Sequence, residues 1–223
     1  MSIDIFNSFV SATLVTLMLA VASLMIGLIL AILFVVLEMN KITLIRQSTS
    51  VFITLLRGLP EILIVFLIYF GLTQLLFLLT DEFIEFDAFW CGAIALGIIF
   101  AAYASQSLRG AIKAIPLGQW ESGAALGFSR AQTFITIIMP QVWRHALPGL
   151  SNQWLVLLKD TALVSLIGVS DLMRQSELIN ASTHKPFTWY SIAALVYLLI
   201  TLISQFFIRK LELRFTRFER GNQ

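Results

Sequence analysis

Long stretches without a charged side chain are the feature that most constrains how this chain can fold. The run from Val10 to Leu37 contains no Asp, Glu, Lys or Arg. As a helix it would be roughly 42 Å long at 1.5 Å per residue, enough to cross a hydrocarbon core of about 30 Å with some tilt. Hydrophobic residues make up 58% of the 223 residues and charged residues only 13%, about half the charged share of a soluble domain. The sequence therefore predicts an all-α, polytopic membrane protein.

Five long apolar runs occur, three of them without a charged residue, and we expect each to form one transmembrane helix of a single domain, residues 1–223. The runs cover approximately residues 10–37, 51–79, 88–108, 148–169 and 189–208. Two of them contain ionisable groups. The second is interrupted by RGLPE, from Arg57 to Glu61, and the fourth carries Lys159 and Asp160.

The distribution of basic residues predicts the orientation of the spans. Eleven of the 15 Lys and Arg residues lie in three segments that five spans would place on one side of the membrane. Because basic loops stay in the cytoplasm, we expect a periplasmic N-terminus and a cytoplasmic C-terminus. The three segments carry Lys41 and Arg46; Arg109, Lys113, Arg130 and Arg144; and Arg209, Lys210, Arg214, Arg217 and Arg220. The opposite side carries the acidic residues Asp81, Glu82, Glu85 and Asp87.

Small residues recur four positions apart in the first and third spans. Such rows let helix backbones approach closely within lipid. We predict a packing face for the longer row, in the third span, whereas the row in the first span is equally typical of ordinary membrane helices. The rows are Ser23, Gly27 and Ala31, and Ala93, Gly97, Ala101 and Ser105.

The segment between the third and fourth spans, about residues 116–145, is predicted to form two short cytoplasmic helices. Gly127 suits a left-handed cap at the end of the first, near residues 119–126. Ser129 and Gln132 have the spacing of a capping box for the second, which we expect to end near Met139 because Pro140 discourages continuation. The apolar side chains of this pair either dock a partner or rest against the membrane domain. They are Trp120, Leu126, Phe128 and Phe134.

This segment resembles the cytoplasmic loop of ATP-binding cassette (ABC) importer permeases. That loop begins Glu-Ala-Ala, continues to a glycine and ends Ile-x-Leu-Pro. At the same spacing this chain has Glu121-Ser122-Gly123, then Gly127, then IIMP ending at Pro140, and it departs at the two alanines and the leucine. Within that family the chain is most similar to the polar-amino-acid class and, in that class, to membrane subunits of bacterial arginine uptake systems. The similar stretches are LRGLPEILIVFLIYFG, AAYASQSLRGAIKAIPLGQWESG and LLKDTALVSLIGVSDL.

The resemblance implies a location and a set of partners. It implies a bacterial inner-membrane subunit that works with two ABC ATPase subunits, a second permease subunit, identical or homologous, and a periplasmic amino-acid-binding protein. The sequence has no Gly-x-x-x-x-Gly-Lys-Ser/Thr phosphate loop, so we expect a transport subunit that is not an enzyme, with ATP hydrolysis on another polypeptide. The resemblance also implies that the ATPase is contacted through Glu121, Ser122, Gly123, Gly127 and Pro140.

Lys159 and Asp160 stand where ionised groups are costly. Each would cost about 2.5–3.5 kcal/mol at mid-bilayer on insertion scales. On a helix they share a polar stripe with Asn152 and Gln153 within an arc of roughly 120°, which must face protein or water. The residues alone leave three interpretations open: a structural contact that fixes helix packing, an intramembrane proton relay, or a solute site.

Glu61 adds a third charge to this part of the membrane domain. It follows Pro60, which weakens a helix, and broken helices in transporters line the solute site. The alternative is a simple kink in which Glu61 pairs with Arg57 at i,i+4. Glu61, Asp160 and Lys159 together carry a charge of −1, complementary to an arginine-like solute. A planar guanidinium also suits fork-like pairing with a carboxylate.

The sequence hypothesis is therefore a site for a polar, basic amino acid, with arginine favoured. Glu61 or Asp160 would meet the cationic group and Lys159 the solute carboxylate. Further polar groups would come from Gln106, Thr161 and Ser165.

Two other functions remain open. One is a proton-coupled secondary amino-acid transporter with Asp160 and Glu61 as proton carriers. The other is a membrane assembly subunit that transports nothing. His145 and His184 each stand alone, so we expect no metal, cofactor or catalytic site, and the basic tail is interpreted as a lipid-headgroup anchor and not as a nucleic-acid site.

Overall fold

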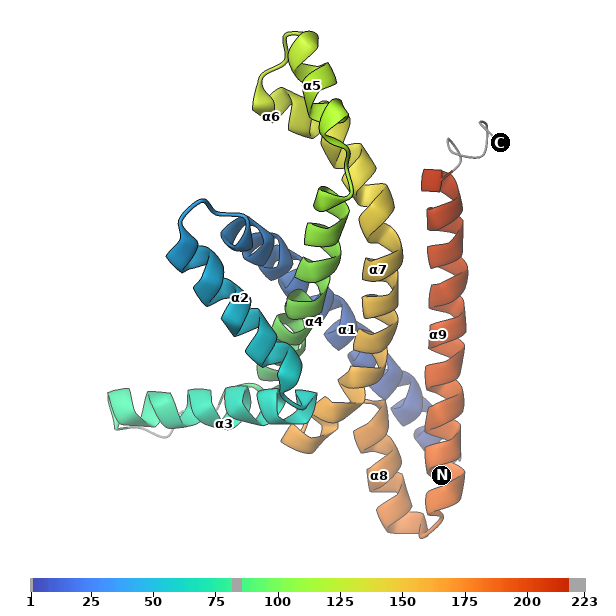
Figure 1. Ribbon diagram of the computed structural model, residues 1–223. Helices are drawn as coiled ribbons and strands as arrows, with labels where there is room; N and C mark the ends of the chain where they lie inside the picture. Colours follow the sequence, from blue (N-terminus) through green and yellow to red (C-terminus); the bar gives the residue numbers. More distant parts are fainter. Residues whose placement is uncertain (1, 82–85, 217–223) are drawn as a thin grey trace.

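The computed structural model describes residues 2–81 and 86–216, and every regular element in those ranges is helical (Figure 1). The all-α prediction is therefore confirmed for this part of the chain. The α-helices are α1 (Ser2–Glu38), α2 (Thr43–Gly58), α3 (Glu61–Thr80), α4 (Ala88–Lys113), α5 (Leu117–Ala125), α6 (Arg130–Thr133), α7 (Met139–Asp160), α8 (Leu172–Thr183) and α9 (Pro186–Thr216). A π-helix, η1 (Phe134–Ile138), and a 3-10 helix, η2 (Thr161–Ile167), complete the list.

Four helical segments of the described chain are long and apolar enough to cross a membrane: Asp4–Glu38, Glu61–Thr80, Ala88–Lys113 and Pro186–Arg214. The second predicted span is divided between α2 and α3. The fourth predicted span starts within α7 and ends just past η2. Of the residues used to predict the orientation, Glu82, Glu85, Arg217 and Arg220 lie outside the described residues.

The two rows of small residues face each other where α1 packs on α4. A Cβ added to Gly97 would lie 2.9 Å from Ile26 Cγ2 and 3.1 Å from the Ser23 backbone oxygen. One added to Gly27 would lie 2.9 Å from the Gly97 backbone oxygen. All seven residues of the two rows are buried. The predicted packing face on the third span is confirmed, and the first row is its counterpart.

The helix α4 is the centre of the molecule. Of its most apolar window, 67% is buried, against 11% for α3 and 6% for α9. It contacts α1, α2, α3, α7 and η2. Figure 1 shows α3 leaving the body beyond α2 and α9 running along the opposite edge. In the same view, α5 and α6 lie at the end where the C-terminus lies, and α8 lies at the end with the N-terminus.

The second cytoplasmic helix does not end near Met139, so that prediction was wrong. The helix α6 passes directly into η1, and Met139 begins α7 with Pro140 in its first turn. A proline is tolerated there because the preceding turn is a π-helix, in which the Met139 amide donates to the Phe134 oxygen, and residue 140 itself contributes no donor. The helix pair predicted to be cytoplasmic is therefore continuous, through α6 and η1, with the helix that carries Lys159 and Asp160.

Candidate functional site

The RGLPE interruption separates two helices. The backbone is extended at Leu59 (φ −90°, ψ 145°) and at Pro60 (φ −58°, ψ 133°), between the end of α2 and the start of α3. Proline has no amide hydrogen and disfavours the helical conformation of the residue before it. Glu61 consequently begins α3, where the helix dipole favours a carboxylate. Arg57 and Glu61 thus belong to different helices and lack the i,i+4 geometry of a continuous one.

A second change of helical path occurs at Asp160. The α-helix α7 ends there, and the following residues, Thr161–Ile167, form the tighter 3-10 helix η2. Asp160 is half-buried, and Lys159 beside it is exposed. The pair that the sequence placed near the middle of one helix therefore lies at the junction of two helical forms.

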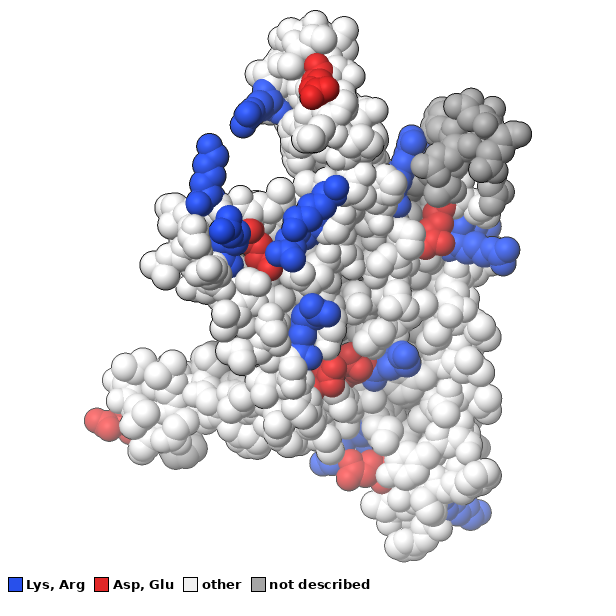
Figure 2. Space-filling model, viewed as in Figure 1, with Lys and Arg blue, Asp and Glu red and all other residues white. Residues whose placement is uncertain are grey.

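The two interrupted regions meet. The helix α3 contacts η2, and the Asp160 carboxylate lies within electrostatic reach of both the Glu61 carboxylate and the Lys159 ammonium. Figure 2 shows acidic and basic side chains gathered at mid-height on a face whose surroundings are largely uncharged. The structure thus brings together the three charges that the sequence hypothesis combined.

Asp160 also lines a small hollow between α4 and α7, together with Tyr103 and Gln153. The hollow has a volume of only about 10 Å³, which is room for about one water molecule. An amino acid does not fit. In this conformation the single chain presents the charges of Glu61, Lys159 and Asp160 beside a small hollow. It does not form a closed solute pocket.

Arg57 is a neighbour of this site that the sequence hypothesis left out of the charge balance. Its guanidinium carbon lies 5.2 Å from the centre of the Tyr103 ring, in the range of a cation–π contact. The Tyr103 hydroxyl donates to the Arg57 backbone oxygen over 3.4 Å. Since Tyr103 lines the same hollow as Asp160, Arg57 adds a positive charge beside the carboxylates. The signal lay in RGLPE itself, where the arginine directly precedes the break.

The three remaining candidate ligands are engaged elsewhere within the chain. Thr161 is fully buried and donates its hydroxyl to the Leu158 oxygen at 2.8 Å. The Ser165 hydroxyl donates to the Ala162 oxygen at 2.7 Å. The Gln106 amide is used in a contact with α1, described next.

Glu38 ends α1 and is almost completely buried, with 1% of its side chain exposed. Its Oε1 accepts from Arg109 Nη1 at 3.1 Å, and its Oε2 accepts from Gln106 Nε2 at 3.0 Å. An acid at a helix C-terminus opposes the helix dipole, so these two donors from α4 stabilise it. The sequence analysis used Arg109 only for orientation and did not consider Glu38. Gln106 and Arg109 are almost one turn apart, so both donors lie on one face of α4.

The two caps predicted for the helix pair α5 and α6 are both present. Gly127 has a positive φ of 76°, its amide donates to the Ala124 oxygen, and the Phe128 amide donates to the Gly123 oxygen. These two bonds form a Schellman motif. The capping box of Ser129 and Gln132 is also present. Both predicted caps are confirmed.

Gly123 is where α5 meets α6, and it explains one departure from the family pattern. A Cβ at this position would clash with the buried Thr133, whose Cγ2 would be 2.4 Å away. Alanine cannot occupy this position unless Thr133 moves. Ser122, the other departure, donates its hydroxyl to the Gly118 oxygen at 2.7 Å on the exposed side of α5.

The apolar side chains of the pair divide into two groups. The Trp120 and Phe134 rings stack with their centres 6.2 Å apart, whereas Leu126 is 69% exposed and Phe128 37%. The first two join α5 to η1, and the second two are free in this chain to meet a partner. Trp120 and Phe134 thus pack within the protein, whereas docking of a partner stays a prediction for Leu126 and Phe128.

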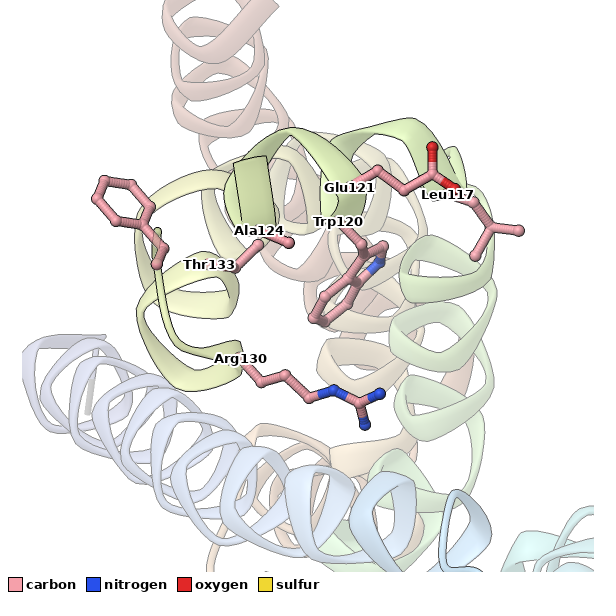
Figure 3. A pocket seen from close by; sticks show the side chains of 7 residues that line it. Leu117, Trp120, Glu121, Ala124, Arg130 and Thr133 are labelled. Atoms are coloured by element: carbon pink, nitrogen blue, oxygen red, sulfur yellow. The ribbon is translucent and has the colours of Figure 1, made fainter. Parts of the chain in front are cut away.

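An open hollow of about 480 Å³ lies between α5 and α6. Figure 3 shows the Trp120 and Arg130 side chains directed into it and Glu121 directed outward beside Leu117. Ala124 and Thr133 also line this hollow. Within residues 2–81 and 86–216, no group of three or more His, Cys, Asp or Glu side chains is arranged to hold a metal ion.

Comparisons with known proteins identify the family. Residues 23–217 match the family described as binding-protein-dependent transport system inner membrane component. The chain is 67% identical to the arginine ABC transporter permease protein ArtQ of Haemophilus influenzae, over 98% of each chain. It is 40% identical to the octopine transport system permease protein OccQ of Rhizobium meliloti, over 92% of this chain and 89% of that one.

A solved structure shows the same fold. The crystal structure of an amino acid ABC transporter with histidines contains a chain with 32% identity and a TM-score of 0.84, covering 96% of both chains. The resemblance seen in the sequence and these matches point to the same family. The chain belongs to the family of binding-protein-dependent transport system inner membrane components; it is a permease subunit of an ABC transporter, a transport subunit whose ATPase is a separate polypeptide.

Proposed function

We propose that this permease serves an importer of basic amino acids, with arginine favoured. One observation carries the proposal: the carboxylates of Glu61 and Asp160 lie within electrostatic reach of each other, beside Lys159, where two interrupted helices meet. The names of the similar permeases, for arginine and for octopine, support a solute of this class.

The charges at the junction suit a solute that carries both signs. An arginine-like molecule presents a guanidinium, an α-ammonium and a carboxylate. Glu61 or Asp160 meets the guanidinium, because a carboxylate pairs with it in a bidentate geometry. Lys159 meets the solute carboxylate. Arg57, held over Tyr103, balances the two carboxylates while the site is empty.

The solute site is completed by a second permease subunit. An exposed ammonium at bilayer depth needs protein or water as its neighbour, and Lys159 is exposed in the single chain. The hollow beside Asp160 is also too small for an amino acid. A facing subunit, identical or homologous, supplies the missing wall.

We assign five membrane crossings: α1, the α2–α3 pair, α4, α7 with η2, and α9. The N-terminus is periplasmic and the C-terminus cytoplasmic, in the bacterial inner membrane. Basic loops and the positions of α5 and α6 near the C-terminal end of α9 support this orientation. Two ATPase subunits dock at α5 and α6, and a periplasmic binding protein delivers the solute at the other end.

Coupling follows from the continuity of the helices. Between the docking surface and Asp160 the chain is helical without a break, through α6, η1 and α7. A displacement of α5 and α6 by the ATPase is therefore transmitted along α7 to Lys159 and Asp160. Glu121, on the outer side of the pair in Figure 3, is placed to meet the ATPase.

The test is uptake of radiolabelled arginine into proteoliposomes that contain the permease, its partner permease and the ATPase. We expect uptake only when ATP is present on the side of the membrane that carries the ATPase. The binding protein must be present on the opposite side. Asp160→Asn should lower uptake at least tenfold, since a charge-assisted hydrogen bond is worth about 1.5–3 kcal/mol. Uptake driven by a pH gradient alone would instead establish a proton-coupled transporter. No flux with every partner present would mean that the chain is not a transport subunit for this solute.

A further inference from the structure

Four oxygen-bearing side chains are buried together where α1, η2, α8 and α9 meet. Thr16, Thr161 and Asp171 are each 0% exposed, and the Tyr197 hydroxyl is buried as well. Polar groups sealed inside a protein need hydrogen-bond partners, because leaving one unpaired costs about 1–3 kcal/mol. The proposed solute site uses none of these four side chains, so they serve another purpose.

The hydrogen bonds of these side chains go to backbone atoms of the surrounding helices. The Leu172 amide donates to Thr16 Oγ1 at 3.0 Å and so joins the start of α8 to α1. The Arg174 amide donates to Asp171 Oδ1 at 2.8 Å and caps α8. Two polar atoms remain without a hydrogen bond among the described residues, Asp171 Oδ2 and the Tyr197 hydroxyl oxygen.

These two atoms complement each other. The Tyr197 hydroxyl lies against the Asp171 carboxylate, with the hydroxyls of Thr161 and Thr16 beside it. A carboxylate oxygen accepts a hydrogen bond and a phenol donates one. A small movement of the phenol ring therefore completes the network.

The position of the cluster in the chain gives it a consequence. Thr161 is the first residue of η2 and directly follows Lys159 and Asp160. Tyr197 comes from α9, which is only 6% buried over its apolar window and contacts α7 and α8. Asp171 links the two, because it caps α8 at the far end of η2. A bond between Tyr197 and Asp171 would therefore fix both ends of η2 against α1 and α9.

We propose that Tyr197 and Asp171 form a latch that positions the junction carrying Lys159 and Asp160. Neither side chain touches the solute; both act by fixing η2. The inference rests on the proposed function for its consequence in solute binding, but the latch itself can be tested without any solute.

The test variant is Tyr197→Phe, which removes one oxygen atom and keeps the ring that packs against the cluster. The matched control is Tyr190→Phe, on the same helix, where the tyrosine is 36% exposed. Hydrogen–deuterium exchange of the complete transporter in nanodiscs, without solute, reports on residues 161–170. We expect exchange there to be about five- to tenfold faster in Tyr197→Phe, as one lost hydrogen bond predicts, and unchanged in Tyr190→Phe.

Equilibrium binding of radiolabelled arginine to the same transporter supplies the second measurement. The latch predicts a Kd that rises by about fivefold in Tyr197→Phe while basal ATP hydrolysis is unchanged. Asp171→Asn is the second variant, and the double variant should be no worse than the more affected single one because both changes remove the same bond.

Two results would overturn the proposal. One is unchanged exchange at residues 161–170 in Tyr197→Phe. The other is faster exchange with an unchanged Kd, which would leave the pair a structural contact only. If the unaltered transporter binds no arginine, exchange alone decides on the latch, and the proposed function fails separately.

Discussion

The contact between α1 and α4 and the junction around Asp160 use opposite solutions within one molecule. At the first, two uninterrupted helices meet through glycine, alanine and serine, and backbone oxygens come within about 3 Å of where a Cβ would stand. At the second, α2 breaks from α3 and α7 changes to η2, and charged side chains fill the space. The tightly packed contact between α1 and α4 therefore holds the interrupted helices in place. Charges that are far apart in the sequence can then meet.

The largest effect is expected from disrupting the contact between α1 and α4. Gly97→Leu places a side chain against Ile26 and the Ser23 backbone, which has no room to retreat. Overpacking of this kind costs about 3 kcal/mol or more, so we expect little folded protein in detergent and a much lower Tm. Gly71→Leu is the control, because nothing lies within 4 Å of its Cβ. Equal Tm values for the two variants would mean that the α1–α4 contact does not stabilise the fold.

The next effect concerns the buried carboxylate at the end of α1. Arg109→Leu leaves Glu38 buried without its cation, which costs about 3–5 kcal/mol, and thermal unfolding should show it. Adding Glu38→Gln should recover much of this loss, since no buried charge then remains. Arg174→Leu breaks an exposed pair with Glu177 and should cost at most about 1 kcal/mol. An Arg109 variant no less stable than the Arg174 variant would contradict the assignment.

A smaller effect is expected in the cytoplasmic pair. Gly123→Ala forces Thr133 to move, at a cost of about 1–3 kcal/mol, and should weaken binding of the ATPase subunits to the permease. Thr133→Ala in the same chain should partly restore that binding. Gly118→Ala, in the same helix with nothing within 4 Å of its Cβ, should leave it unchanged. Normal ATPase binding by Gly123→Ala alone would show that the α5–α6 contact does not shape the docking surface.

The smallest effect comes from the capping box. Ser129→Ala removes the side-chain bond to the Gln132 amide, which is worth about 1 kcal/mol. Faster hydrogen exchange should be confined to the first turn of α6, with no change in the transmembrane helices. Exchange that is equal to that of the unaltered protein would mean that η1 and α7 hold this turn without the cap.

Local signals in the sequence predicted local structure well. The rows of Gly27 and Gly97, the Gly127 cap and the Ser129 box each depend on neighbours within one helical turn or on a repeated spacing. Pro140 misled the prediction because the π-helix η1 before it keeps the helical path continuous although residue 140 has no amide hydrogen.

Contacts between distant segments were harder to predict. Glu38 meets Arg109 and Gln106 because α1 packs on α4, and no spacing along the chain contains that information. The same holds for Arg57 over Tyr103. Residue types were informative about which side chains carry charge into the membrane. They could not show that Thr161 and Ser165 turn into the protein while Glu61 lies within electrostatic reach of Asp160.

The central claim is that Glu61 and Asp160 together select a cationic side chain. Its most direct test is equilibrium binding of arginine and of citrulline, its neutral isostere, to the purified membrane complex without the binding protein. The unaltered transporter should prefer arginine by at least about tenfold, and Glu61→Gln should reduce that preference to less than about threefold. Glu177→Gln, at an exposed site, should leave it unchanged. An arginine preference that survives Glu61→Gln intact would contradict the account.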